Sequence, residues 1–266
     1  MPISLESVSY TYAPGTAFQC RAIDGLSLTV DDGEFVGIMG STGSGKSTLI
    51  QLMAGLLTPS SGRVLLDGED IHPKSYDRIK LRRRVGLVFQ YPEYQLFEEM
   101  VYQDIAFGPK NMGLDEKEVD RRVRSAAELV GITDDQLKAS PFDLSGGQKR
   151  RVAIAGVIAM NPEVLILDEP TAVLTPQETD KLFAVMRNMK ADGKSLIIIT
   201  HKLHEVLEVS DRVAVLRKGE YIGDVMTADA NQQSLTDMMV GHSVTLNINR
   251  PDPVNVTPRL KVEGLT

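Results

Sequence analysis

The sequence is poor in several features that mark secreted, zinc-binding or membrane-spanning proteins. Its 266 residues include no tryptophan and a single cysteine, Cys20. One cysteine forms neither an internal disulfide nor a cysteine-based zinc site, which makes a reducing compartment the simplest environment. The longest apolar run, VAIAGVIAM at 152–160, is too short to cross a bilayer. The first ten residues lack a basic stretch followed by an apolar one, so we expect no secretory signal and a cytoplasmic chain.

Positive charge is not in excess either. The chain has 29 Lys and Arg residues against 36 Asp and Glu residues, a formal net charge of -7. This balance argues against nonspecific binding to nucleic acid. Three short basic clusters, at 80–84, 121–124 and 149–151, are predicted to be solvated faces of helices. With 42% hydrophobic residues, the chain is long enough for one large globular domain or one domain with lobes.

Short apolar runs without alternation recur along the chain and are rich in β-branched residues. Strands that are covered on both faces have this character. The runs lie at 34–40, 84–90, 163–168, 195–200 and 212–217. Segments with helical spacing separate them, such as 115–132, where Asp115 and Glu118 resemble a capping box. The pattern predicts an α/β domain with a mostly parallel sheet.

Other regions have a different character. Residues 3–12 and 22–30 alternate more regularly and predict a small antiparallel sheet. Long helical patterns with few strands occupy 72 to about 160 and indicate a helical lobe inserted into the α/β core. Prolines and weak periodicity predict a linker at 241–258. The last residues, RLKVEGLT at 259–266, are similar to the first predicted strand, so we expect a second copy of the unit to begin there.

The segment GSTGSGKST at 40–48 follows a predicted strand and opens a helical pattern. It matches the G-x-x-x-x-G-K-[ST] phosphate-binding loop in its required context, which a plain glycine-rich turn would not need. The glycines allow backbone N–H groups to close around phosphate oxygens. Lys46 brings a positive charge to the outer phosphates, and Ser47 is the expected Mg²⁺ ligand. The candidate nucleotide-binding residues are Gly40, Ser41, Thr42, Gly43, Ser44, Gly45, Lys46, Ser47 and Thr48.

A pair of carboxylates, Asp168 and Glu169, follows the apolar run EVLIL. Ligands bind at this end of the strands in open α/β sheets. We expect Asp168 to hold Mg²⁺ directly or through water, and Glu169 to accept a proton from an attacking water or to orient it. Adjacent acids after a strand are often only a solvated turn, but the phosphate loop favours the catalytic interpretation.

The segment LSGGQKRR at 144–151 lies between these two motifs. In this setting, four of its residues resemble the signature of the ATP-binding cassette (ABC) ATPases, namely Ser145, Gly146, Gly147 and Gln148. In that family the signature faces a phosphate that is held by the phosphate loop of another subunit. The resemblance therefore implies two cassettes that pair head to tail and enclose two ATP molecules with Mg²⁺.

The same resemblance implies the fold and its boundaries. The ABC cassette is a P-loop NTPase of the α/β class with a RecA-like core, an antiparallel β subdomain and an inserted helical subdomain. In this chain the cassette would occupy 1–240 and the helical subdomain about 91–160. The segment 259–266 would then be the first strand of a truncated second cassette.

The resemblance also implies roles for residues that a motif scan would not single out. Tyr12 matches the aromatic residue that stacks on adenine. Gln90 matches the glutamine that senses Mg²⁺ and the attacking water, in a loop that touches the membrane partner. His201 matches the switch histidine that contacts the γ-phosphate. Together with Lys46 and Glu169, Gln90 and His201 complete the expected catalytic set.

Two kinds of ABC importer ATPase are similar to different parts of the chain. Residues 1 to about 170, with TGSGKSTLIQLMAGLL and LSGGQKRRVAIAGVIAM, resemble the ATPases of energy-coupling factor (ECF) transporters, which import vitamins and metal ions. Residues from about 171 to 266, with TPQETDKLFAVM and LTDMMVGHSV, resemble the first cassette of sugar and nucleoside importers. We therefore expect a hybrid joined near 165–172, produced by recombination, by an assembly error or by construction. A single divergent lineage is the alternative.

Thr175 is the residue that marks this change. Most cassettes, those of the ECF type included, carry an aspartate at this position that links the two ATP sites across the dimer. Thr175 is nevertheless a good N-cap, with Pro176 at the first helical position and Glu178 closing a capping box. The sequence predicts a normal helix start, and the resemblance implies altered communication between the two ATP sites.

The resemblance implies an ATP-binding and ATP-hydrolysing subunit of an ECF-type importer at the cytoplasmic face of the membrane. Its partners would be a second ABC ATPase subunit and transmembrane transporter subunits. The alternatives are a sugar or nucleoside importer ATPase, or a hybrid that binds ATP but couples poorly to transport. ABC proteins that act on DNA or ribosomes typically carry long heptad inserts or zinc cysteines. The sequence has neither, so no nucleic-acid partner is expected.

Overall fold

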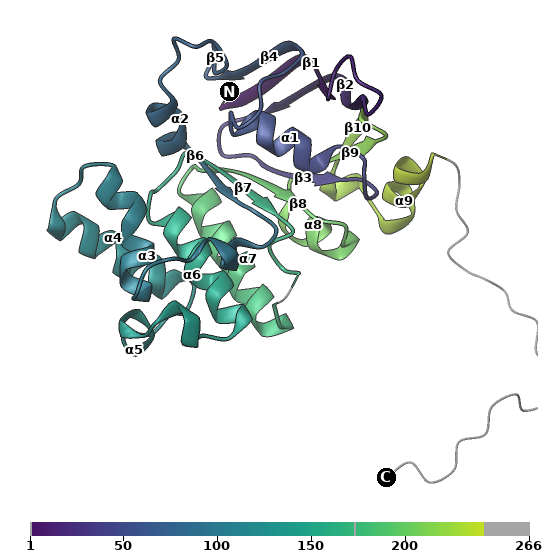
Figure 1. Ribbon diagram of the computed structural model, residues 1–266. Helices are drawn as coiled ribbons and strands as arrows, with labels where there is room; N and C mark the ends of the chain where they lie inside the picture. Colours follow the sequence, from purple (N-terminus) through teal and green to yellow (C-terminus); the bar gives the residue numbers. More distant parts are fainter. Residues whose placement is uncertain (1, 173, 242–266) are drawn as a thin grey trace, which may run out of the picture.

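The computed structural model describes residues 2–172 and 174–241, which form two sheets with helices around them (Figure 1). The larger sheet contains, in spatial order, β10 (Glu220–Met226), β9 (Arg212–Arg217), β3 (Phe35–Met39), β8 (Ser195–Ile199), β7 (Val164–Asp168) and β6 (Val85–Val88). All neighbouring pairs from β9 to β6 are parallel, and β10 is antiparallel to β9 at one edge. The predicted α/β class with a mostly parallel sheet is confirmed.

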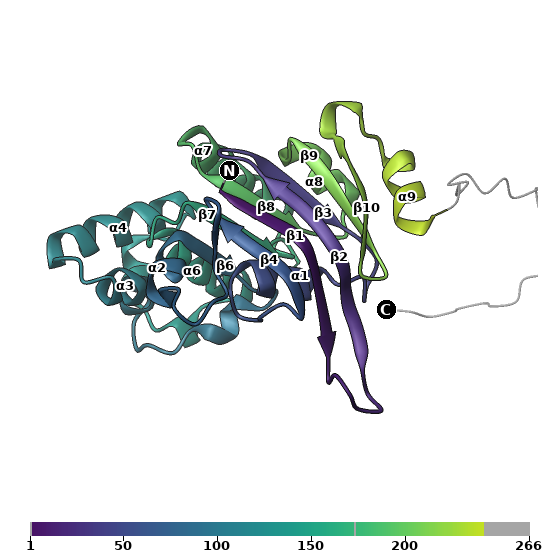
Figure 2. The same ribbon diagram turned by 90° about the horizontal axis from the view of Figure 1, so that it is seen from above.

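The smaller sheet is antiparallel, as predicted, and consists of β2 (Cys20–Val30), β1 (Ile3–Tyr12), β4 (Ser61–Leu66) and β5 (Glu69–Asp70). Viewed from above, β1 and β2 form a long hairpin that extends beyond the larger sheet (Figure 2). Helix α1 (Lys46–Met53) packs with this sheet and with one face of the larger one in a shared hydrophobic core.

Successive residues of the parallel strands point into two different hydrophobic cores. Val164 and Ile166 of β7 pack in the core that contains α1 and the antiparallel sheet. Leu165 and Leu167 pack in the core that contains the helices of the opposite face. Because both faces are covered, every residue of β3, β7 and β8 is buried, which accounts for apolar runs without alternation.

Between β6 and β7 the chain is mostly helical, which confirms the inserted helical subdomain of the expected fold. The elements are η1 (Pro92–Gln95), α3 (Val101–Asn111), α4 (Glu116–Leu129), α5 (Asp134–Lys138), η2 (Pro141–Asp143) and α6 (Gly146–Ile158). In α4 the apolar side chains of Val119, Val123 and Ala127 are buried. Asp115 caps this helix by accepting a hydrogen bond from the Glu118 backbone N–H at 3.0 Å.

The remaining helices are α2 (Arg78–Arg84), α7 (Pro176–Ala191), α8 (Leu203–Val209), η3 (Thr227–Asp229) and α9 (Gln232–Val240). The start of α7 is the predicted one. Thr175 accepts from the Glu178 N–H, and the Glu178 side chain accepts from the Thr175 N–H, so the capping box is complete.

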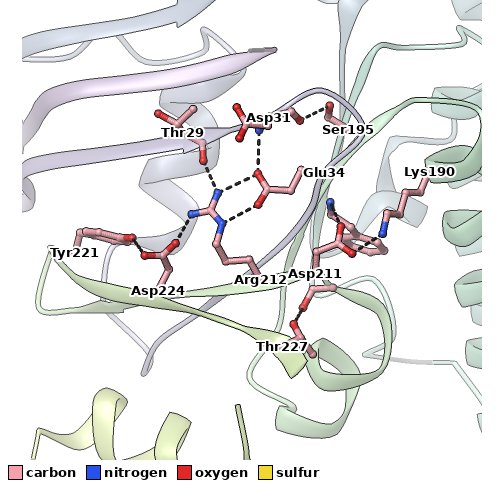
Figure 3. A network of polar contacts seen from close by, with 12 residues as sticks. Thr29, Asp31, Glu34, Lys190, Ser195, Asp211, Arg212, Tyr221, Asp224 and Thr227 are labelled. Atoms are coloured by element: carbon pink, nitrogen blue, oxygen red, sulfur yellow. Dashed lines mark hydrogen bonds and ion pairs between the residues drawn. The ribbon is translucent and has the colours of Figure 1, made fainter. Parts of the chain in front are cut away.

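A polar network at the amino ends of the parallel strands joins the two sheets (Figure 3). Arg212, the first residue of β9, donates to both carboxylate oxygens of Glu34, from Nε at 2.7 Å and from Nη2 at 3.0 Å. Its Nη2 also donates to the Thr29 carbonyl of β2 at 2.6 Å, and Nη1 donates to Asp224 of β10 at 2.5 Å. Tyr221 donates to the second oxygen of Asp224 at 2.6 Å. One guanidinium thus connects β9 to β10 and to β2 of the smaller sheet.

The predicted linker at 241–258 lies almost wholly outside the described residues, and the predicted strand at 259–266 lies outside them altogether. Within the part of the chain that the structure describes, no helix has both the length and the apolar character needed to cross a bilayer.

Candidate functional site

The predicted site residues outside the signature segment meet at the carboxyl ends of the parallel strands. The phosphate loop follows β3, Gln90 lies just beyond β6, Asp168 ends β7, and His201 follows β8. A pocket of about 350 Å³ opens at this edge. It is lined by Tyr12, Cys20, Arg21, Ala22, Thr42, Gly43, Gly45, Lys46, Ser47, Thr48, Gln90, Asp168 and Glu169.

The loop at 40–48 has the geometry of a phosphate cradle. Gly43 and Gly45 have φ of 78° and 99°, a region that residues with a side chain rarely adopt. A Cβ on Gly40 would lie 2.3 Å from the Ser44 hydroxyl, so the loop also needs glycine for close packing. The Lys46 ammonium donates to the carbonyls of Gly40 and Ser41 at 2.7 and 3.0 Å. Helix α1 begins at Lys46, so its amino end and this charge face the same space.

The two carboxylates that follow β7 are both buried, Asp168 at 6% and Glu169 at 8% exposure. Burial, and the neighbouring charge of Glu169, raise the pKa of Asp168 to about 6, while Lys46 opposes this rise. Burial also lowers the pKa of Lys46, although the charges of Glu169 and Asp168 act to raise it. The site therefore concentrates negative charge that a cation would relieve.

Glu169 is held in an unusual way. Its φ is 48°, in the left-handed region, and its backbone N–H donates to the Ile199 carbonyl at 2.8 Å. One carboxylate oxygen, Oε1, lies 2.9 Å from His201 Nδ1, and the other, Oε2, is buried with no hydrogen-bond partner. A buried carboxylate oxygen with a free acceptor site is suited to a water or to another ligand.

The oxygen donors of the pocket fit Mg²⁺ bound together with a phosphate. Ser47, Gln90 and Asp168 supply a hydroxyl, an amide and a carboxylate, the hard ligands that Mg²⁺ takes. Over the ranges 2–172 and 174–241 no group of three His, Cys, Asp or Glu side chains could hold a metal ion. Mg²⁺ usually keeps several waters and shares its ligands with substrate phosphates, which agrees with so sparse a protein donor set.

Tyr12 lies at the pocket as predicted, and its hydroxyl is 3.2 Å from Thr48 Oγ1. Its ring packs edge-on against Tyr10, with the ring centroids 4.8 Å apart. Cys20, Arg21 and Ala22 also line the pocket, although no sequence motif pointed to them as site residues. They arrive there because Cys20 pairs with Tyr12 across the β1–β2 hairpin, a register that no local motif reveals.

The signature residues do not join this pocket. Ser145 is the exposed N-cap of α6, where it accepts from the Gln148 N–H at 3.4 Å while the Gln148 side chain accepts from the Ser145 N–H at 2.8 Å. Gly146 is also exposed. None of the four signature residues lines the pocket of the phosphate loop. The chain therefore presents a phosphate loop and a signature segment at separate places.

The prediction that 149–151 is a solvated helix face is wrong for Arg150. This side chain has 0% exposure, because α6 packs its inner face against the strands and the η1 segment. Its Nη2 donates to the Glu169 carbonyl at 2.5 Å. The burial of a charged residue next to the signature could not be read from charge clustering alone. The clusters at 80–84 and 121–124 are mixed, since Arg84 and Arg122 are half-buried in ion pairs and the other basic residues of both clusters are exposed.

Comparisons with known proteins assign the chain to a family. The family model described as ABC transporter matches residues 23–172. The energy-coupling factor transporter ATP-binding protein EcfA2 of Symbiobacterium thermophilum is 54% identical over 82% of this chain and 76% of its own length. EcfA2 of Clostridium perfringens is 46% identical over 92% of this chain and 86% of its own length. The solved structure of cbiO1 from Clostridium perfringens, described as part of the ABC transporter complex cbiONQ, is 39% identical. It has a TM-score of 0.78 and covers 90% of this chain and 94% of that one.

These comparisons give no support to a hybrid chain. An alignment that covers 92% of the chain includes most of the residues after 171, so the similarity to energy-coupling factor ATPases does not stop near 165–172. The expected change to a sugar- or nucleoside-importer type is likewise unsupported. The matches to the family model and to relatives that span most of this chain agree on one assignment. The chain belongs to the ABC transporter family, among the ATP-binding proteins of energy-coupling factor transporters, and is an ATPase.

Proposed function

We propose that this chain hydrolyses MgATP in a head-to-tail pair of cassettes and thereby powers an importer of vitamins or metal ions at the cytoplasmic face of the membrane. The observation that carries the proposal is the arrangement of Glu169. Its Oε1 lies 2.9 Å from His201, and its Oε2 is buried, unpartnered and at the pocket of the phosphate loop.

In this proposal each residue at the pocket has a distinct task. Glu169 Oε2 accepts a hydrogen bond, and then a proton, from the water that attacks the γ-phosphate. His201 orients the Glu169 carboxylate and contacts the γ-phosphate. Lys46 releases its two carbonyl acceptors and neutralises charge on the outer phosphates.

The remaining groups bind and orient ATP. Tyr12 packs against the adenine, and backbone N–H groups of the loop at 40–48 hold the phosphates. Mg²⁺, when bound with ATP through Ser47, Gln90 and Asp168, would supply charge neutralisation between the phosphates. Its charge would also return Asp168 to the ionised form that burial disfavours.

The separation of the signature from the phosphate loop is the reason for proposing a pair. Ser145 and the following N–H groups stand exposed at the amino end of α6, a position suited to a phosphate. Since they do not line the pocket of their own chain, they would serve the ATP held by a second cassette. Each of the two sites would then combine one phosphate loop with the other subunit's signature.

A membrane partner would contact the segment beside Gln90. This segment and α3 expose a group of large apolar side chains, with Tyr94 at 84%, Phe97 at 58%, Tyr91 at 51% and Phe107 at 46%. The Phe97 and Phe107 rings pack edge to face, 5.0 Å between centroids. Exposed aromatic residues of this density mark interaction surfaces.

The domain boundaries are part of the same proposal, with the cassette at 1–240 and its helical subdomain at about 91–160.

A mixing experiment tests the composite site. Lys46→Ala removes phosphate binding in one half-site. Ser145→Asp keeps a strong helix N-cap but places a negative charge opposite the partner's phosphate. Each variant alone should lose hydrolysis, whereas a mixture should regain part of it, because one of the two sites in a mixed pair is intact. If the chain pairs with a different cassette, the two changes are placed on the two subunits. Mixtures that stay inactive in both arrangements contradict the proposed pairing.

A second experiment tests the transport partner. The chain is co-expressed with an energy-coupling factor membrane subunit and, separately, with a sugar-type permease, and each pair is purified and assayed for uptake of substrate. We expect a stable complex and ATP-dependent uptake only with the first. Complex formation with the permease alone would contradict the assignment of the partner. Stimulation of hydrolysis by nucleic acid would instead point to an ABC protein that acts on DNA or ribosomes.

A further inference from the structure

Arg150 is the one charged side chain in the described ranges that has no exposure at all and is also aimed at a site residue. It belongs to α6, five residues after the exposed Ser145, and its guanidinium reaches the loop that follows β7. There Nη2 donates to the Glu169 carbonyl at 2.5 Å. The contact joins the helix of the signature to the backbone of the residue proposed to polarise water.

The backbone at Glu169 needs such support. With φ at 48° it lies in a region that is unfavourable for residues with a side chain, and such conformations persist only where the surroundings hold them. The N–H of Glu169 is fixed by Ile199 at 2.8 Å. Its carbonyl receives Arg150 and, at 3.3 Å, the N–H of Ala172. Arg150 thus supplies the shortest bond on the carbonyl side, and that bond comes from another subdomain.

The same guanidinium faces the segment that follows Gln90. Nη1 of Arg150 lies 3.9 Å from Oε2 of Glu93 in η1, close enough for an ion pair but too far for a hydrogen bond. Neither Nε nor Nη1 of Arg150 has a hydrogen-bond partner, nor does the buried Oε2 of Glu93. Contacts between α6 and η1 are extensive, so these two elements form one packed unit.

Stability alone gives little reason for a guanidinium at this place. A buried charge with incomplete hydrogen bonding is expensive, and apolar residues of similar volume are often as stable or more stable. Burial also lowers the pKa of Arg150, although Glu93 and Glu169 oppose this effect. An apolar side chain could fill the volume, but it could not bond to the Glu169 carbonyl.

We propose that Arg150 is a positioning residue, which holds the Glu169 backbone in its left-handed conformation and ties it to the η1 segment that follows Gln90. Its task is to aim the Glu169 carboxylate at the attacking water, and it touches neither ATP nor the water itself. A displacement of η1 by a partner would reach Glu169 through this guanidinium. This inference rests on the proposed role of Glu169 in hydrolysis.

The test compares two arginines that each donate to a backbone carbonyl. Arg150→Lys keeps the charge but lacks the planar fork, and Arg150→Met keeps the length but lacks a donor. The control is Arg122→Lys, because Arg122 also donates to a backbone carbonyl, Met160 at 3.2 Å, and to a carboxylate, Glu118 at 2.7 Å, far from the pocket. Each variant is assayed in the dimer that hydrolyses ATP, for kcat, for KM and for equilibrium binding of nucleotide.

We expect both Arg150 variants to lower kcat by about 10- to 100-fold, the scale that a small misplacement of a catalytic group produces. KM and nucleotide binding should change by less than about threefold, because the phosphate loop is untouched. Arg122→Lys should keep the kcat of the parent. In a Glu169→Gln background the Arg150 variants should have almost no further effect on residual turnover, since the group that they position has already been removed.

Three results would overturn the inference: parental kcat in the folded Arg150 variants, an equal fall in Arg122→Lys, or an undiminished fall in the Glu169→Gln background. If one Arg150 variant does not fold, the other decides. Failure of the proposed function looks different, because Glu169→Gln by itself would then retain parental turnover. The single Glu169 variant is therefore measured first.

Discussion

The two ends of the larger sheet differ in how well their polar groups are paired. At the amino ends, Arg212 bonds to Glu34, Asp224 and the Thr29 carbonyl, and Lys190 pairs with Asp211 (Figure 3). In the described part of the chain no buried side-chain atom of this network lacks a partner. At the carboxyl ends, by contrast, some buried polar atoms have no hydrogen-bond partner.

At the carboxyl ends the polar groups are left incomplete. The Ser44 hydroxyl and Glu169 Oε2 are buried without a hydrogen bond, and Asp168 and Glu169 lie together as like charges. Glu169 also has a strained backbone. Polar groups that bind a substrate need free hydrogen-bond donors and acceptors. Polar groups that only hold strands together form all their hydrogen bonds within the fold. We therefore expect substitutions at the carboxyl ends to alter activity and substitutions at the amino ends to alter stability.

The largest effect is expected for Glu169→Gln. Loss of the group that accepts the proton should lower kcat by about 100- to 1000-fold. The free energy of unfolding should stay the same or rise, because one of two adjacent buried charges is removed. Steady-state hydrolysis and thermal unfolding of the same preparation check both statements. Parental turnover would show that Glu169 does not polarise the water, and a large loss of stability would show that this end also holds the fold together.

Arg212→Ala tests the opposite end. Its side chain is 16% exposed and serves three acceptors, so its removal should lower the free energy of unfolding by about 2 kcal/mol. Turnover per folded molecule should remain at the parental level. The matched control is Arg63→Ala, which breaks the exposed ion pair with Glu6 and should cost less than about 1 kcal/mol. The free energy of unfolding is measured by chemical denaturation. An equal decrease for Arg212→Ala and Arg63→Ala would mean that burial of the network adds nothing to stability.

Acid should weaken the same network. Burial raises the pKa of Asp224, but hydrogen bonds from Tyr221 and Arg212 outweigh it and hold the pKa below the usual 3.8. A carboxyl group with a lowered folded-state pKa contributes stability above its unfolded pKa, and this contribution is lost as the pH falls through the folded value. The free energy of unfolding should therefore fall below about pH 4, and less so in Asp224→Asn. Parallel curves for the parent and the variant would contradict this.

The smallest effect is expected for Thr175→Asp, beside the carboxyl ends. Aspartate is as good an N-cap as threonine, so the capping box with Glu178 should survive and stability should change by less than about 0.5 kcal/mol. An aspartate here should nevertheless strengthen communication between the two ATP sites. The Hill coefficient for ATP measures this, with Thr175→Ser as the control for a retained hydroxyl. An unchanged Hill coefficient in Thr175→Asp would contradict the link.

The sequence pointed most directly to candidate groups that depend on local chain geometry. The loop at 40–48, the pair Asp168 and Glu169, and the helix start at Thr175 each lie within one short segment. A strand followed by a glycine loop and a helix can bind phosphate in only a few ways. Those features could be assigned before any contact was known.

Other parts of the site could not be found in this way. The charge pattern at 149–151 predicts a solvated face, but Arg150 is buried because α6 packs against β6 and η1. Cys20 reaches the pocket through the register of the β1–β2 hairpin. The bond between Arg212 and Glu34 joins residues 178 positions apart. Sequence spacing carries no information on such pairs.

The sequence by itself determined the order of strands and helices, the phosphate loop and the acid pair, because hydrophobic period, caps and glycine conformations act over a few residues. The tertiary structure alone decided which of these groups face one another. It brought Glu169 to His201 and to Arg150, and it set the signature apart from the phosphate loop. The physical reason is that burial and charge pairing depend on distance in space, which packing of the whole chain fixes.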